Sequence, residues 1–478
     1  MTDGPVDGRW RLAGRAVVLA AVVVALVGAQ PYAGGWNDGS RLATAESLGE
    51  RGTFVIDDSV FVRVPPETQP TPYPPGRADL LTLGTLDKLQ IGGHFYSDKS
   101  PVPNVLMAGL YRAWLTLGGP TAGERPDLFC WFLTVASSGL AYIVTVIAIR
   151  QLGATVGLSG STLFLLTVAV AFGTVAPAYS RHVNSHILFL GAAAMMCLGL
   201  ANRCRKRGWP VVVGTAAGFA YTCDLGVGPV QLVCLAPYCV WAYRGWKPVA
   251  IVGLAALPWV VAHHALNYAI AGTLLPANMV PEYLNWPGSP FVGDVMTGSL
   301  RHGPGWLALY AADLVIGKKG ILLNNIPLWL APGGAVLLGL RRRELRPALA
   351  FCIGWSALTV LLYAATSSNY GGQCCSVRWF VPLIAPGFWV VALTLREYPR
   401  YRPDFAWLTG CGVVLGALMW WGGPWAPKMV PGLWGWVAAA GVGWGVVRWR
   451  SRGAASAPAS GLRPDRYADL TTRSSSAA

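Results

Sequence analysis

A few acidic and basic residues stand out in a chain that is otherwise apolar. Asp38 closely follows the first long apolar run, Asp98 and Lys99 are adjacent in the stretch "GGHFYSDKSP", and Arg378 directly precedes a late apolar run. A carboxylate can take a proton from a hydroxyl nucleophile. Lys and Arg side chains can hold a phosphate. Residues of these types therefore predict transfer chemistry on a substrate that carries a phosphate.

The composition indicates that these residues are positioned by a membrane protein. Of the 478 residues, 54% are hydrophobic and only 12% are charged, whereas a soluble domain carries about a quarter charged residues. Apolar runs of about 20 residues recur, which predicts an all-α polytopic fold with about 11–13 transmembrane helices. The runs lie near 12–33, 128–149, 156–178, 183–201, 209–222, 227–243, 248–266, 320–340, 347–366, 379–395, 404–421 and 430–447.

The basic residues indicate which side of the membrane each loop faces. Short Lys- and Arg-rich segments alternate with longer loops that are poorer in them, which predicts that both termini are cytoplasmic in the cell (inner) membrane. The formal net charge of +15 is then a topology signal, and no nucleic acid is expected as a partner. One domain, 1–452, would carry two large extracytoplasmic loops, 34–127 and 267–319, and a disordered cytoplasmic tail would follow at 453–478. The first run also resembles a signal peptide, whose cleavage would leave the remaining topology unchanged.

All of the unusual polar clusters fall on the predicted outer side. A phosphate held there at the membrane surface would belong to a lipid, because a lipid-linked substrate presents its head group at that depth. Extracytoplasmic space has no nucleotide sugars, so sugar transfer on that side must use polyprenyl-phosphate donors. We expect Lys99, Arg378 and Lys318 to bind the donor phosphate, and Asp98, Tyr96, Asp58 and His94 to line the substrate pocket.

Three motifs resemble the GT-C superfamily of membrane glycosyltransferases, in the branch of protein O-mannosyltransferases and bacterial lipid A aminoarabinose transferases. They are an acidic residue after the first span ("NDGSRLATAESL"), a "KPP"-like motif ("YSDKSP") and an Arg that starts a late span ("CSVRWFVPLIAP"). The stretches "RGTFVID" and "NYGGQCCSVRWFVP" also look like an uncharacterised bacterial subgroup. The chain departs in having Asp38 alone where many relatives have Asp-Glu, and "KSP" in place of "KPP".

The resemblance implies a catalytic role for Asp38 as the base of a direct inverting displacement. Lys99 and Arg378 would stabilise the leaving lipid phosphate. The product would be a hexosyl or pentosyl group on an extracytoplasmic glycan, lipid or protein of the cell envelope. A divalent metal stays open as a cofactor, although no motif of the sequence specifies one.

Simpler interpretations stand beside these. Asp38 could cap a helix, and Asp98 with Lys99 could form a structural ion pair. His182 and His186, on consecutive turns of one helix face, have the spacing of metal ligands but no carboxylate near them in sequence. The alternative function is a polytopic transporter or lipid flippase without glycosyl transfer, for which Asp224 in "CDLGVGP" would be the starting point.

Overall fold

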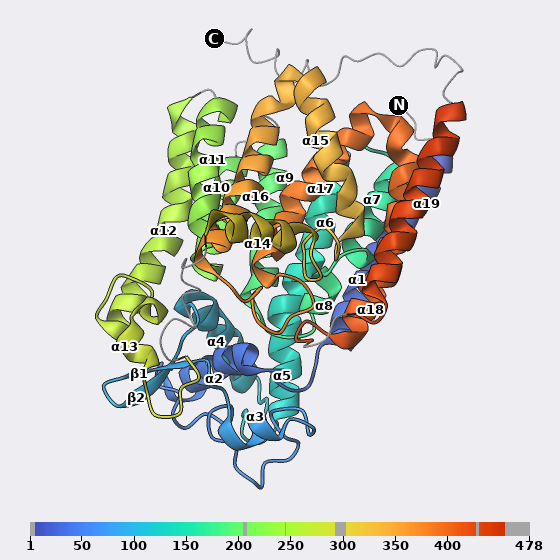
Figure 1. Ribbon diagram of the computed structural model, residues 1–478. Coiled ribbons are helices and arrows are strands. Elements are labelled where there is room, and N and C mark those ends of the chain that lie inside the picture. The colour runs from blue at the N-terminus through green and yellow to red at the C-terminus, as the bar shows by residue number, and fades with distance from the viewer. Residues whose placement is uncertain (1–4, 204–207, 244, 292–302, 427–429, 455–478) are drawn as a thin grey trace.

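The computed structural model describes residues 5–203, 208–243, 245–291, 303–426 and 430–454. The predicted disordered tail therefore lies, from residue 455 onward, outside the described residues. Long helices run side by side as a bundle, and a layer of short elements covers one end of it (Figure 1). We call this layer the cap layer.

The bundle contains a helix for each of the twelve predicted apolar runs. These helices are α1 (Pro5–Gly28), α5 (Pro126–Thr134) continued through a π-helical turn by α6 (Leu140–Thr155), α7 (Gly160–Phe172), α9 (Ser185–Ala201), α10 (Trp209–Cys223), α11 (Val227–Tyr243), α12 (Trp246–Ala271), α15 (Leu330–Arg341), α16 (Arg346–Thr366), α17 (Ile384–Glu397), α18 (Arg402–Gly422) and α19 (Leu433–Ala454). Six helical stretches of the described chain are long and apolar enough to cross a membrane. The predicted all-α polytopic membrane fold is confirmed.

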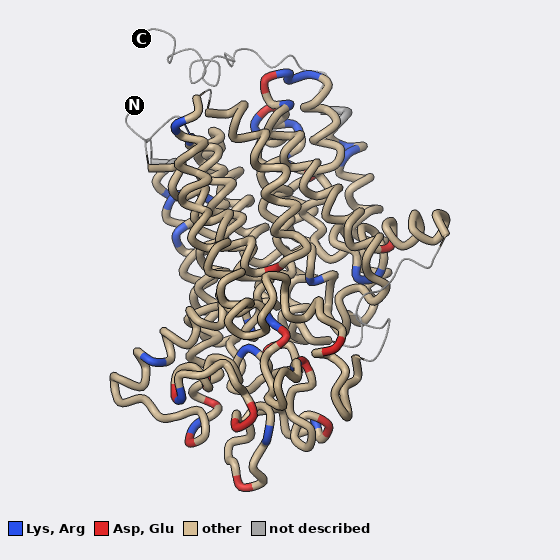
Figure 2. Tube along the Cα trace, turned by 90° about the vertical axis from the view of Figure 1, so that its left-hand side faces the viewer, with Lys and Arg blue, Asp and Glu red and all other residues tan. Residues whose placement is uncertain are grey.

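The cap layer is built mainly from the first long loop. It contains α2 (Trp36–Arg51), α3 (Ala78–Leu83), the hairpin of β1 (Lys88–Ile91) and β2 (His94–Ser97), α4 (Pro101–Thr116) and α13 (Pro281–Leu284). α8 (Ala176–Tyr179) is a short helix between α7 and α9, and α14 (Pro304–Ile316) lies across the bundle (Figure 1). Charged residues gather at the two ends of the molecule and leave its middle mostly free of charge, with many of the acidic ones in the cap layer (Figure 2).

The "YSDKSP" motif lies between a strand and a helix. β1 and β2 pair antiparallel with Lys88 opposite Ser97, around a turn in which Gly92 and Gly93 both have positive φ. α4 begins at Pro101, in the first turn, where a helix tolerates proline because the missing N–H would have no partner there. Asp98 and Lys99 are thereby held at the point where β2 ends and α4 begins.

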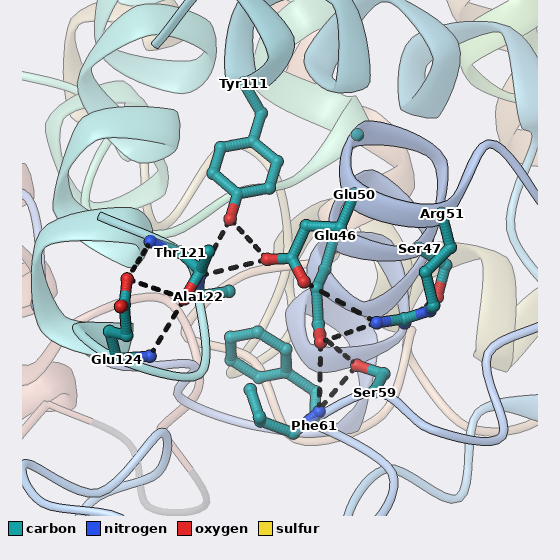
Figure 3. Close-up of polar contacts among 12 residues, drawn as sticks. Glu46, Ser47, Glu50, Arg51, Ser59, Phe61, Tyr111, Thr121, Ala122 and Glu124 are labelled. Carbon is teal, nitrogen blue, oxygen red and sulfur yellow. Dashed lines mark hydrogen bonds and ion pairs between the residues drawn. The ribbon is translucent and has the colours of Figure 1, made fainter. Parts of the chain in front are cut away.

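A buried polar network holds the second half of α2 in the cap layer (Figure 3). Glu46 accepts hydrogen bonds from the Ser59 hydroxyl and the Val60 N–H, and Glu50 accepts one from Tyr111 of α4. Arg51 lies 3.6 Å from both carboxylates. Burial raises the pKa of Glu46 to about 8. The network ties α2 to the following loop and to α4, so the first turns of α2 face the bundle in a fixed orientation.

Candidate active site

The first turns of α2 lie alongside the segment 182–186, where α9 begins. Asp38 lies 3.0 Å from the His182 Nδ1 atom, and the Arg41 Nη2 atom donates a hydrogen bond of 2.9 Å to the Ser185 hydroxyl. Three residues of helix rise about 4.5 Å. The Asp38–His182 pair and the Arg41 guanidinium are therefore neighbours along one helix.

Asp38 both caps α2 and pairs with a histidine. Its carboxylate accepts the N–H groups of Gly34 at 2.6 Å and Gly35 at 2.9 Å, and the side chain is fully buried. The Nδ1–H of His182, if oriented toward Asp38, leaves the lone pair of Nε2 for another group. No hydrogen bond of the described residues is seen for that Nε2 atom. A substrate proton would therefore reach this pair through His182.

The structure differs from the expectation that His182 and His186 lie on one face of a helix. α9 begins only at Ser185, with Asn184 as its N-cap, so His182 precedes the helix and does not share a helix face with His186. The two histidines contact different carboxylates, Asp38 and Asp224. Within the described residues, no group of three or more His, Cys, Asp and Glu side chains is placed to hold a metal ion.

Lys99 lies between two carboxylates. Its Nζ atom is 2.6 Å from Asp98 and 2.6 Å from Asp87, and all three side chains are nearly buried. Burial raises the pKa of Asp98, an effect that the charge of Lys99 opposes. Ser40 adds a long contact of 3.4 Å to the Asp98 carboxylate. The ammonium group is thus matched by protein carboxylates within the cap layer.

Arg41 and Arg378 lack such partners. Arg41 is only 4% exposed, yet its Nε and Nη1 atoms are buried without a hydrogen-bond partner, as is the Nε atom of Arg378. Among the described residues, neither guanidinium has a carboxylate within ion-pair distance. Burial lowers the pKa of Arg41, and the charge of Arg378 lowers it further. Buried unpaired donors are costly, so these two residues form a site that favours an anion.

The position of Arg378 is set by the loop before α17. It begins the 3₁₀ helix η6 (Arg378–Leu383), which leads directly into α17. The N–H of Val377 donates to the Lys319 carbonyl at 2.8 Å, and the Trp379 ring stacks on Tyr363 with centroids 4.2 Å apart. Both flanking residues are therefore fixed, and the guanidinium is directed from a rigid segment.

An apolar groove begins about one helical turn along α9 from Ser185, the hydrogen-bond partner of Arg41. It has a volume of about 540 Å³ and is lined by α4, α6, α9, α10, α12 and the π-helical turn before α6. Leu188, one turn after Ser185 on α9, and Pro103 of α4 contribute to the lining. Leu106, Leu110 and Leu140 of the same lining are exposed. The groove therefore opens sideways, toward the region that the bilayer occupies in a membrane.

The remaining predicted pocket residues are distributed unevenly. Tyr96 lines a small hollow together with Lys99. Asp58 is exposed, His94 is exposed and pairs with Asp57 at 2.8 Å, and the Lys318 side chain is exposed. These last three lie outside the buried cluster of Asp38, Lys99, Arg41 and Arg378.

Several residues of the cluster could not be predicted from the sequence motifs. Arg41, Asp87 and Asp224 join it, and His182 and His186 join it as partners of carboxylates and not as metal ligands. Arg41 carries one usable signal, because it is an Arg on the side of the membrane where Arg is scarce. The His182–Asp38 pairing joins residues 144 positions apart, which no local pattern reveals.

Comparisons with known proteins give distant structural likenesses only. No family model and no curated protein matches the chain. Among solved structures, it is similar to ArnT from Cupriavidus metallidurans in the apo state, with 13% identity and a TM-score of 0.49 over 92% of this chain and 75% of that one. The structure of ArnT from the same organism bound to undecaprenyl phosphate gives 13% identity and a TM-score of 0.48, over 90% of this chain and 75% of that one.

An oligosaccharyltransferase from Archaeoglobus fulgidus gives 10% identity and a TM-score of 0.47, over 87% of this chain and 56% of that one. ArnT is a lipid A aminoarabinose transferase, and both proteins belong to the GT-C superfamily that the sequence motifs resemble. Likenesses this distant carry no evidence on the reaction, which has to be argued from the site.

Proposed function

We propose that this protein transfers a sugar from a polyprenyl-phosphate donor to an extracytoplasmic acceptor by inverting displacement. The observation that carries the proposal is the pair of guanidiniums of Arg41 and Arg378, each of which has a buried N–H group without a partner among the described residues. An apolar groove that opens sideways includes Leu188, one turn along α9 from the Ser185 that contacts Arg41. A ligand that satisfies both features has an anionic head and a long apolar tail, as a polyprenyl phosphate does.

The Asp38–His182 pair supplies the proton acceptor of this mechanism. The acceptor hydroxyl would lose its proton to the pair through His182 Nε2, with Asp38 stabilising the charge that develops on the ring. The oxygen would then attack the anomeric carbon from the face opposite the phosphate. Arg41 and Arg378 would stabilise the negative charge that grows on the leaving phosphate.

Lys99 has a different role in this scheme from direct phosphate binding. Its ammonium group already contacts Asp87 and Asp98, and it lies at the start of α4, whose Pro103 lines the groove. We therefore assign Lys99 a structural role, in which it holds Asp87 and Asp98 in place at the start of α4. Tyr96 and Asp98 remain on the side where the sugar would lie.

The reaction would take place on the extracytoplasmic side. The cap layer lies at the end of the bundle opposite the start of α1 and the end of α19 (Figure 1). A cysteine introduced at the exposed Pro70 should react with an impermeant reagent in intact cells, and one at Arg343 should not. Labelling at Arg343 alone would reverse the orientation and contradict an extracytoplasmic site.

A reconstituted assay tests the proposed reaction. The full-length protein is given a panel of labelled polyprenyl-phosphate sugars in liposomes, and sugar release or transfer is measured. Asp38→Asn should lower turnover by roughly a thousandfold, because an Asn N–H facing His182 Nδ1 moves the ring proton to Nε2 and removes the lone pair. Donor binding should be largely kept, since Asn can still cap α2.

Two results would oppose the proposal. Near-normal turnover in Asp38→Asn would reduce Asp38 to a helix cap. Movement of the lipid or of a solute across the bilayer, with no cleavage of the sugar–phosphate bond by the wild-type protein, would favour the transporter or flippase alternative.

A further inference from the structure

A second histidine–carboxylate pair, His186 with Asp224, lies near the two arginines. His186, in the first turn of α9, is 5% exposed, and its Nδ1 atom is buried without a hydrogen bond. The nearest carboxylate oxygen is Asp224 Oδ2, at 3.6 Å. The sequence placed Asp224 in the turn between two spans, and the structure shows what holds it there.

Asp224 is oriented by its other oxygen. Oδ1 accepts the N–H groups of Gly226 at 2.8 Å and Val227 at 3.1 Å, and the hydroxyl of Tyr363 at 2.9 Å. Oδ2 is therefore left for His186. Tyr363 also stacks on Trp379, next to Arg378, so Asp224 and the arginine are held on one rigid wall.

The charged groups that act on His186 come from several elements. Arg41 of α2, Arg378 of η6 and Lys99 before α4 are the cations in range. Asp98 and Asp87, which hold Lys99, and Asp224 are the carboxylates of the same cluster. Tyr363 of α16 and Cys223 at the end of α10 are the remaining titratable neighbours, contacting Asp224 and acting on Arg41.

The ionised groups of this cluster balance one another. Apart from Asp38, which faces His182, three cations (Arg41, Arg378 and Lys99) face three carboxylates (Asp87, Asp98 and Asp224) when all are charged. A phosphate dianion entering between the arginines would add two negative charges. A proton taken up by His186 would offset one of them, with the imidazolium lying between Asp224 and the phosphate.

We propose that His186, oriented by Asp224, protonates the leaving lipid phosphate. This role rests on the proposed function and adds to it a catalytic acid separate from the Asp38–His182 base. As the bond between the anomeric carbon and the phosphate oxygen breaks, its electron pair stays on that oxygen, which takes the proton from the imidazolium. The acceptor oxygen forms the new bond to the anomeric carbon, and its own proton goes to His182. His182 then releases its proton to water, and His186 takes one up from water.

The product lipid, undecaprenyl phosphate, is the probe that tests this without knowledge of the sugar. Its affinity for the full-length protein is measured in detergent between pH 6.5 and 9. The second pKa of a phosphate monoester is about 6, so above about pH 7 the free lipid is a dianion. If the complex holds a proton that neither partner carries when free, the affinity falls by about tenfold per pH unit.

Two variants and two controls test whether His186 holds the proton that the complex takes up. His186→Asn should flatten the pH dependence to within about threefold over the whole range. Asp224→Asn keeps the oxygen that accepts from Gly226, Val227 and Tyr363 but removes the charge facing His186, so it should flatten the dependence too. Asp98→Asn removes another carboxylate of the same cluster, one that does not face His186, and should keep the slope.

His264→Asn is the matched control, because His264 of α12 contacts Tyr221 and the Leu274 carbonyl and lies outside the cluster. It should also keep the wild-type slope. A wild-type affinity that does not change with pH would overturn the inference without any variant, as would an unchanged slope in His186→Asn or Asp224→Asn. Failure of the wild-type protein to bind undecaprenyl phosphate at any pH would instead overturn the proposed function.

Discussion

Lys99 and the two arginines of the candidate site, Arg41 and Arg378, are held in opposite ways. Lys99 lies 2.6 Å from each of two carboxylates, so its charge is matched within the protein. Arg41, which is buried, and Arg378, which is half-buried, lie at the same end of the bundle with N–H donors that nothing in the described chain satisfies. A buried donor without a hydrogen-bond partner costs more free energy than one with a partner. An anionic ligand therefore gains most binding free energy at the arginines. A basic residue in a motif that resembles a known family is thus less informative about anion binding than a basic residue without a partner.

The largest effect on lipid binding is expected when both arginines are changed. Arg41→Met with Arg378→Met keeps the apolar stems but removes both charges. Each hydrogen bond to a charged group contributes about 1.5–3 kcal/mol, so affinity for undecaprenyl phosphate should fall by roughly a hundredfold or more. Lys318→Met, at an exposed lysine, is the matched control and should bind as the wild type does. If the double arginine variant and Lys318→Met lost the same affinity, the arginines would act only through the net positive charge of the protein.

Lys99→Met tests whether Lys99 has a structural role or binds the phosphate directly. It would leave Asp87 and Asp98 without their cation, and breaking a buried pair in this way costs about 3–5 kcal/mol of unfolding free energy. Affinity for undecaprenyl phosphate, measured on the folded fraction, should fall less than in either single arginine variant. A thermal unfolding series beside the binding series checks both values. If stability is unchanged while affinity is lost, Lys99 itself contacts the phosphate, as its motif first suggested.

The smallest effect concerns Glu46, in a cluster with no ligand role. Burial raises its pKa to about 8. A carboxyl whose folded pKa is above the unfolded value stabilises the fold at low pH, and this contribution is lost as pH rises toward 8. The wild type should lose about 2 kcal/mol of stability between pH 6 and 7.5. Glu46→Gln, which keeps a partner for Ser59, should remove that slope in thermal unfolding scans, and an identical slope in both proteins would contradict it.

The sequence was informative about the membrane-spanning helices because their signal is local. A run of about 20 apolar residues has few alternatives to a helix, and each of the twelve predicted runs contains one. The β-hairpin that carries "HFYS" was not predicted. Its strands are four residues long, and its pairing depends on a glycine turn and on packing against α13.

Part of the candidate site could be predicted from the sequence, but most of its pairings could not. Asp38, Lys99 and Arg378 stand out because charge is rare in this chain. Their partners do not, since His182 reaches Asp38 across 144 positions and Asp87 looks like any residue of a loop. Which cation is left unmatched depends on the folded arrangement, and that arrangement decides where an anion would bind.

The most direct test of the central claim is the location of the lipid phosphate. An experimental structure of the full-length protein with bound undecaprenyl phosphate would show it. We predict the phosphorus atom between Arg41 and Arg378, within about 4 Å of both guanidiniums, the ion-pair range for charged groups, and the first isoprene units in the groove beside Leu188. A phosphate bound at Lys99 or Lys318, with both arginines unliganded, would contradict the claim.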